Sequence, residues 1–250
     1  MTHRPTTEST GSLDPRLRLI LFGGGHGADY REAEHLFGEW VGPDGQVLLI
    51  AAPGIHPQNL DRDVDRLASH LREVGVPRLT IWDESVIEAP GFSPDLTPYS
   101  GICFAASRPH EIVPMLRTSG LDRALVEAAH AGSVIYAENL LTPLLGPDLR
   151  YTALSGYDIT NHGIEDTAGL SLTTDGDGNP TIYLGIYRGL PTSNRRYPQR
   201  IANETGARVC TIPAASTIAI RDGDVQQLGH RTFTWYDPKR RRGDRSAPTG

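Results

Sequence analysis

The stretch GSVIYAENLL (Gly132–Leu141) decides the fold. SVIYA (Ser133–Ala137) is a short apolar run rich in β-branched and aromatic residues, which is typical of a buried strand. Glu138 and Asn139 follow at once, before a second apolar segment begins. A strand that turns sharply into a helix lifts one side chain above the edge of a sheet and aims helix N–H groups at the same point, as in a nucleophile elbow. We therefore expect Glu138 or Asn139 at the tip of such a turn.

Strand-like runs alternate with helical patterns on the amino-terminal side of this stretch. The expected strands are Arg16–Phe22, Gln46–Ala51, Arg78–Asp83 and Gly101–Ala106, and the expected helices cover Tyr30–Trp40, Leu60–Val74 and His110–Ala131, the last broken near Gly120. The second strand, QVLLIA, is a near-continuous apolar run of the kind that is covered on both faces. The alternation predicts an α/β fold, a three-layer sandwich in which helices cover both faces of a mostly parallel central sheet.

The second half of the chain has a different pattern. Leu170–Thr174 and Thr181–Tyr187 flank the sequence DGDGNP, which predicts an extra β-hairpin. A helix over Arg196–Thr205 and three short strands complete the pattern, the strands covering Val209–Ile212, Thr217–Arg221 and Val225–Leu228. There is no internal repeat and no second linker. We expect one α/β domain over residues 16–237, a disordered N-terminus over 1–15 and a disordered tail over 238–250.

Composition excludes several classes of protein. The 250 residues carry a formal charge of −6. The tail holds five basic residues against Asp244, a local charge of +4, so the body carries −10, which disfavours nucleic-acid binding. No apolar run reaches the ~18 residues of a membrane span, and the N-terminus has no apolar core of a secretory signal. The two cysteines, Cys103 and Cys210, fall in apolar strands and are expected to be buried thiols of a cytoplasmic protein.

Neither a metal nor a cofactor is expected. The nine histidines form no pair at metal-binding spacing. GGGHGA (Gly23–Ala28) follows the first strand and formally fits a dinucleotide fingerprint, but no acidic residue follows about 20 positions later, at the end of the second strand. The interpretation is a close backbone turn that lines the ligand crevice of an α/β protein, with Gly24, Gly25 and His26 available to a substrate.

The order of these segments resembles the dipeptidase E and cyanophycinase family of serine peptidases, which have a class I glutamine amidotransferase-like fold. The resemblance covers about Arg16 to Gly229. It rests on FGGG (Phe22–Gly25), LLIAAP (Leu48–Pro53), the turn and helix over Ala105–Gly120, the strand at the elbow and the closing segment Gln199–Gly229.

The departures from that family fall on its catalytic residues. The family carries G-x-S-A-G at the elbow, where this chain has Ala137–Leu141, so Asn139 stands in place of the nucleophilic serine, or Glu138 after a shift of one residue. The family's Gly-Gly-Asn turn at the oxyanion hole reads Ala105-Ala106-Ser107 here. The segment matching the family's catalytic histidine contains none. It ends in Tyr187 and Arg188, and His162 is the nearest alternative base. The resemblance therefore implies a divergent member without the Ser-His pair.

Three functions stay open on this sequence. In the first, the elbow cleft binds a small amino-acid- or peptide-like molecule without hydrolysis. In the second, a non-serine enzyme uses Glu138 as a general base or carboxylate nucleophile, and a raised pKa would suit that role. The third is a scaffold, and a homodimer stays open. A conventional peptidase is the alternative should the alignment be wrong. The candidate catalytic residues are Glu138, Asn139, Tyr187, Arg188 and His162, and the candidate substrate-binding residues are Gly24, Gly25, His26, Ala105, Ala106, Ser107, Arg108 and Tyr136.

Glu138 and Asn139 also have purely structural interpretations. A carboxylate at a helix start interacts favourably with the helix dipole. An asparagine there is a common N-cap.

Overall fold

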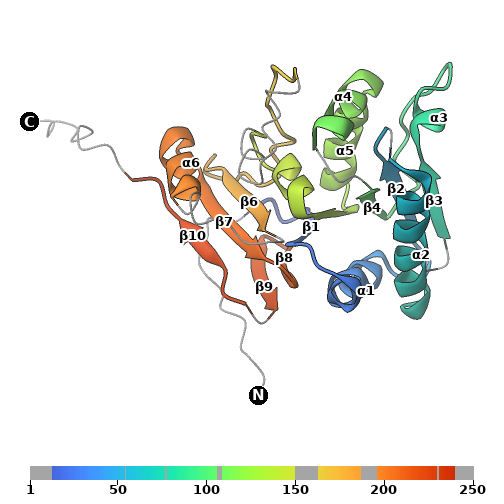
Figure 1. Cartoon of the computed structure of the whole chain (residues 1–250), viewed down its shortest axis with the longest axis horizontal. Coiled ribbons are helices and arrows are strands. Elements are labelled where there is room, and N and C mark those ends of the chain that lie inside the picture. The colour runs from blue at the N-terminus through green and yellow to red at the C-terminus, as the bar shows by residue number, and fades with distance from the viewer. Residues whose placement is uncertain are drawn as a thin grey trace, which may run out of the picture.

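The computed structural model describes residues 13–53, 55–76, 78–105, 109–149, 163–186, 196–229 and 231–239. Its centre is a seven-stranded sheet with the order β3-β2-β4-β5-β1-β8-β9 (Figure 1). The five parallel strands are β1 (Arg18–Phe22), β2 (Gln46–Ala51), β3 (Arg78–Trp82), β4 (Gly101–Ala105) and β5 (Val134–Glu138). Two antiparallel strands, β8 (Ser216–Arg221) and β9 (Asp224–Gly229), extend the sheet beyond β1.

Helices cover both faces of this sheet, as the sequence predicts. One face packs against α1 (Arg31–Val41) and α2 (Pro57–Glu73), and the other against α4 (Pro109–Ser119), α5 (Leu121–His130) and the 3₁₀ helix η2 (Asn139–Leu145) (Figure 1). The short elements η1 (Gly27–Tyr30) and α3 (Glu84–Ile87) follow β1 and β3. The predicted break in the long helix is confirmed, because Gly120 at φ +75° separates α4 from α5. The α/β sandwich is therefore confirmed.

Side chains of β5 alternate between the two cores. Ile135 and Ala137 belong to the core that contains α4 and α5, whereas Val134 and Tyr136 belong to the core beneath α1 and α2. Because the period of a strand is two, Glu138 lies on the same face as Tyr136. The elbow carboxylate is therefore aimed towards α1 and α2.

A second sheet of three strands was not predicted. It has the order β10-β7-β6, formed by β10 (Thr234–Tyr236), β7 (Arg208–Pro213) and β6 (Thr181–Ile186), and α6 (Tyr197–Thr205) packs on it. β6 and β7 are parallel, and β10 joins β7 antiparallel. β6 also contacts η2, which brings this sheet to the elbow.

The hairpin predicted over 170–187 is wrong for its first arm. The described residues of that arm form only an isolated bridge between Thr174 and Pro180, while β6 forms as expected. The reason is competition for backbone hydrogen bonds, since the N–H groups of Leu170 and Leu172 donate to the carbonyls of Leu144 and Leu145 in η2. The antiparallel hairpin of the second half is β8–β9 instead.

The predicted disordered ends lie mostly outside the described residues. Residues 1–12 and 240–250 belong to that part. The last residues of the predicted N-terminal segment do not fit the prediction, because Leu13 is buried and Asp14 forms an ion pair with Arg16. Within the described ranges, no helix combines the length and apolar character needed to cross a bilayer.

Candidate functional site

Asn139 stands at the tip of a sharp turn. β5 ends at Glu138, and Asn139 has φ +50°, in the left-handed region that few residues other than glycine adopt readily. Asparagine is among the residues that tolerate this conformation best. The segment that follows is the 3₁₀ helix η2 rather than an α-helix, and it contains Pro143, which has no N–H to donate. The geometry places Asn139 above the sheet edge and leaves Glu138 in the strand.

Thr142 fixes the elbow to the second sheet. Its Oγ1 lies 2.9 Å from the carbonyl oxygen of Asn139 and 3.0 Å from that of Tyr183, and it accepts a hydrogen bond of 2.9 Å from the N–H of Gly185. Thr142 is fully buried. One hydroxyl therefore ties the tip of the turn to two residues of β6.

The glycine turn after β1 lies beside the elbow, because Phe22 is paired with Glu138. A Cβ at Gly23 would lie 2.0 Å from the carbonyl oxygen of Pro213, so only glycine fits there. Gly24 has φ +86°, and its carbonyl accepts a hydrogen bond from Ala215. The turn is therefore a close backbone approach at the carboxyl end of β1, and exposed His26 follows it.

β4 and β5 separate at the carboxyl edge of the sheet. Their pairing ends at Cys103 and Tyr136, whereas β4 remains paired with β2 as far as Ala105. Ala105 and Glu138 therefore both lie beyond the last residue pair that joins β4 and β5, at the carboxyl edge of the sheet. Ligands of α/β proteins bind outside the carboxyl ends of parallel strands. The other candidates, Ala106, Ser107, Arg108, His162, Tyr187 and Arg188, lie outside the described residues.

The carboxyl group of Glu138 has an unusually high pKa. The Tyr136 hydroxyl donates a hydrogen bond of 3.4 Å to Glu138 Oε2. Burial raises the pKa of Glu138 to about 7, Glu34 and Asp63 act in the same direction, and Arg66 opposes them. Burial and the Glu138 charge hold the pKa of Tyr136 well above its ordinary value, so the phenol stays a neutral donor. A carboxyl group that titrates near neutral pH can both accept and release a proton.

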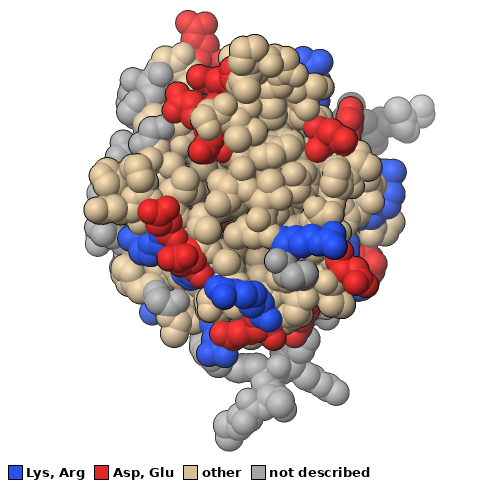
Figure 2. Space-filling model, turned by 90° about the vertical axis from the view of Figure 1, so that its right-hand side faces the viewer, with Lys and Arg blue, Asp and Glu red and all other residues tan. Residues whose placement is uncertain are grey.

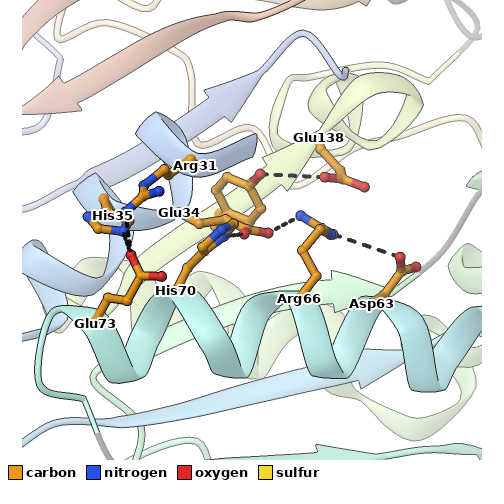
Figure 3. A network of polar contacts seen from close by, with 9 residues as sticks. Arg31, Glu34, His35, Asp63, Arg66, His70, Glu73 and Glu138 are labelled. Carbon is orange, nitrogen blue, oxygen red and sulfur yellow. Dashed lines mark hydrogen bonds and ion pairs between the residues drawn. The ribbon is translucent and has the colours of Figure 1, made fainter. Parts of the chain in front are cut away.

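The charges around Glu138 come from a network that sequence reasoning missed (Figure 3). Glu34 on α1 is fully buried, and Arg66 and His70, one turn apart on α2, contact its two carboxylate oxygens. The Arg66 guanidinium also lies over the Tyr30 ring, 3.7 Å from its centroid, and 3.9 Å from Asp63. The only sequence signal was a pair of basic residues at i and i+4 on α2, which by itself is typical of a solvated helix face.

The described residues offer few alternatives for the chemistry. Cys103 and Cys210 are both buried, as predicted. Burial raises the pKa of Cys103 well above its ordinary value, which makes it a poor nucleophile. Among the residues that the structure describes, no three His, Cys, Asp or Glu side chains are grouped so that they could hold a metal ion.

Comparison with known proteins places the fold. No family model matches the sequence, and no curated protein is significantly similar to it. A candidate peptidase E protein from Listeria monocytogenes EGD-e shares 15% identity with a TM-score of 0.54, over 89% of this chain and 99% of that one. A peptidase from an acI-B1 Actinobacterium shares 12% identity with a TM-score of 0.60, over 90% and 96%. The chain therefore has the peptidase E-like, class I glutamine amidotransferase-like fold that the sequence resemblance implies.

Proposed function

We propose that the chain acts on, or binds, a small amino-acid- or peptide-like molecule at the elbow, without a serine nucleophile. The observation that carries the proposal is the pairing of Asn139 at the tip of the turn with Glu138 directly below it, whose pKa is about 7. The amide of Asn139 cannot be activated by a base as a serine hydroxyl is. Within the part of the chain that the structure describes, the acid–base group of neutral pKa at the tip is then the carboxyl group of the preceding residue, Glu138.

In the enzymatic form of the proposal, Glu138 is a general acid–base. Ionised Glu138 takes a proton from a water molecule. The oxygen of that water molecule attacks the carbonyl carbon of an amide or ester bond in the same step. Protonated Glu138 then passes that proton to the leaving amine or alcohol, which restores the carboxylate and completes a hydrolysis. General acid–base catalysis contributes about 10²–10⁴-fold.

The surrounding residues adjust this carboxyl group. The hydrogen bond from Tyr136 orients it, and the positive charge of Arg66 favours its ionised form. Glu34 holds Arg66 in place through a buried ion pair. Gly24, Gly25, His26 and Ala105 border the crevice where the substrate would lie. Ala106, Ser107, Arg108, Tyr187, Arg188 and His162 remain candidates from the sequence alone.

A binding or scaffold protein is the second candidate function. It is favoured by the absence of a hydroxyl or thiol from the tip of the turn, at Asn139. Such a protein would hold the same ligand class in the crevice and release it unchanged. A conventional serine peptidase is the remaining alternative.

The test uses the full chain with a panel of dipeptides, aminoacyl amides and aminoacyl esters. Turnover that falls at least about 100-fold in Glu138→Gln, with the fold and melting temperature kept, supports the enzyme. Glu39→Gln is the matched control, since Glu39 is an exposed carboxylate on α1. An unchanged rate in Glu138→Gln removes this residue from the mechanism. Thermal stabilisation by a panel compound without any product supports the binding protein instead. Labelling by a fluorophosphonate probe would contradict the proposal and restore the serine peptidase.

A further inference from the structure

The outer edge of β3 is the least protected edge of the central sheet. β3 is the terminal strand, paired only with β2 among the strands of the described chain. Alternate residues of an edge strand present their N–H and C=O groups outward without a partner, which makes the edge a template for another strand. Proteins usually guard such edges with lysine, proline, a bulge or a covering loop. β3 reads RLTIW, and its only charge is Arg78 at the start.

The exposed apolar side chains of the described residues gather at this edge. Two large hydrophobic side chains of the described residues are exposed, Ile81 at 37% and Val86 at 38%. Ile81 lies in β3, and Val86 lies in α3, which follows directly. Trp82, the residue after Ile81, is half-buried. Its ring packs edge-on against the rings of Phe92 and Tyr99. Single exposed hydrophobic residues need no explanation, but their concentration on one open strand edge does.

Charged side chains lie around the rim of this side of the molecule rather than over its centre (Figure 2). Figure 2 shows the molecule from the side on which β3, α2 and α3 lie, with a broad uncharged centre and both acidic and basic side chains around its rim. The opposite edge of the sheet differs. β9 presents Asp224 and Gln226 as exposed residues, and its Val225 is buried. The two edges of one sheet are thus built differently, and only one suits an apolar partner.

We infer that the chain forms a homodimer in which β3 pairs antiparallel with β3 of a second copy. A two-fold axis perpendicular to the sheet makes such a contact self-complementary and closed. In the register that is symmetric about Thr80, Leu79 faces Ile81 of the second copy, and Arg78 faces Trp82 of the second copy. Both pairs are chemically matched, because the first is aliphatic and the second places a guanidinium beside an aromatic ring.

Charge complementarity favours a second copy as the occupant. The strand begins with Arg78 and is followed by Asp83 and Glu84. Under the two-fold axis, the basic end of each strand meets the acidic end of the other. The same axis sends the carboxyl edges of the two sheets in opposite directions, so both elbows stay open. Dimerisation therefore does not depend on the function proposed for the elbow.

The oligomeric state of the full chain tests this inference. Size-exclusion chromatography with light scattering at roughly 1–100 µM protein should give twice the monomer mass. Ile81→Lys should raise the dissociation constant of the dimer by roughly 100-fold, since the substitution occurs twice in a two-fold interface. Gln226→Lys, which puts the same charge on β9 at the other edge, should leave the dimer intact. Circular dichroism and the melting temperature show that each variant is folded.

Two further measurements keep the inference falsifiable if Ile81→Lys fails to fold. Val86→Lys places a charge on the same surface outside the sheet and should also favour the monomer. Hydrogen exchange of the β3 amides should slow as the protein concentration rises, because pairing covers them. A monomer at every concentration overturns the inference. So does a dimer that survives both lysine substitutions with unchanged exchange at β3, because its interface then lies elsewhere.

Discussion

Gly185 in β6 lies so close to Asn139 that a Cβ atom there would come within 2.6 Å of both the Cα atom and the carbonyl oxygen of Asn139. The second sheet thus packs directly against the backbone of the elbow, at a residue without a side chain. Gly185→Ala should push β6 and the turn apart and lower the free energy of unfolding by roughly 1–3 kcal/mol, measured by urea denaturation. Gly146→Ala is the control, because the nearest atom to a Cβ at Gly146 would be the carbonyl oxygen of Pro143, 3.3 Å away. Equal losses in the two variants would contradict the close approach.

The central sheet could be predicted because its strands are signalled locally. QVLLIA forms β2 over the residues expected, since a continuous apolar run of that length is typical of a strand covered on both faces. The long helical pattern divides at Gly120, where only a residue that accepts positive φ continues the chain. The resemblance to the peptidase E fold followed from the order of such segments.

The remaining features depend on contacts between distant residues. β10 is three residues long, and β6 pairs in parallel with β7 across α6, so neither pairing has a local signal. Glu34 and Arg66 lie 32 positions apart, and nothing in either helix alone indicates that they meet in the core. The left-handed conformation of Asn139 could be suspected from its residue type, but it is decided by the turn into η2.

Asn139 should tolerate glycine better than alanine. At φ +50° an L-residue with a Cβ is strained, whereas glycine is not, and asparagine lies between them. Asn139→Ala should therefore destabilise the protein by about 1–2 kcal/mol relative to Asn139→Gly. Denaturant unfolding of both variants under the same conditions measures the difference. Equal stabilities would mean that the turn is not held in the left-handed region in solution.

Removing one partner of the buried ion pair beneath the elbow should cost far more than removing one partner of its exposed counterpart. Glu34→Gln leaves Arg66 and His70 without the carboxylate that they contact in the core, and it should cost roughly 3 kcal/mol. Glu73 on the same helix pair contacts Arg31 and His35 at 2.8 Å, but it is 40% exposed. Glu73→Gln should cost much less than Glu34→Gln, because solvent screens an exposed ion pair. Similar costs for the two variants, measured by urea unfolding at neutral pH, would refute the buried network.

Glu138 should make stability depend on pH in a definite direction. Its pKa is about 7 in the folded state against 4.5 for an ordinary glutamate, so the folded protein binds this proton more tightly than the unfolded chain. The stabilising contribution of the protonated form is therefore complete below pH 4.5 and is lost as the pH rises through 7. Glutamine cannot ionise, so Glu138→Gln lacks this loss. The stability of Glu138→Gln relative to wild type should increase between pH 5 and 8 by about 2–3 kcal/mol.

Burial is the largest cause of the raised pKa of Glu34, and it acts in both proteins, so most of the Glu34 contribution cancels in this comparison. Glu39→Gln is the control for the Glu-to-Gln substitution itself, since Glu39 is an exposed carboxylate on α1. Urea unfolding at several pH values measures all three proteins. A difference between Glu138→Gln and wild type that stays constant from pH 5 to 8 would show that Glu138 titrates like a solvated glutamate. It would then lack the neutral pKa on which the proposed acid–base role depends, and the binding function would become the better account of the elbow.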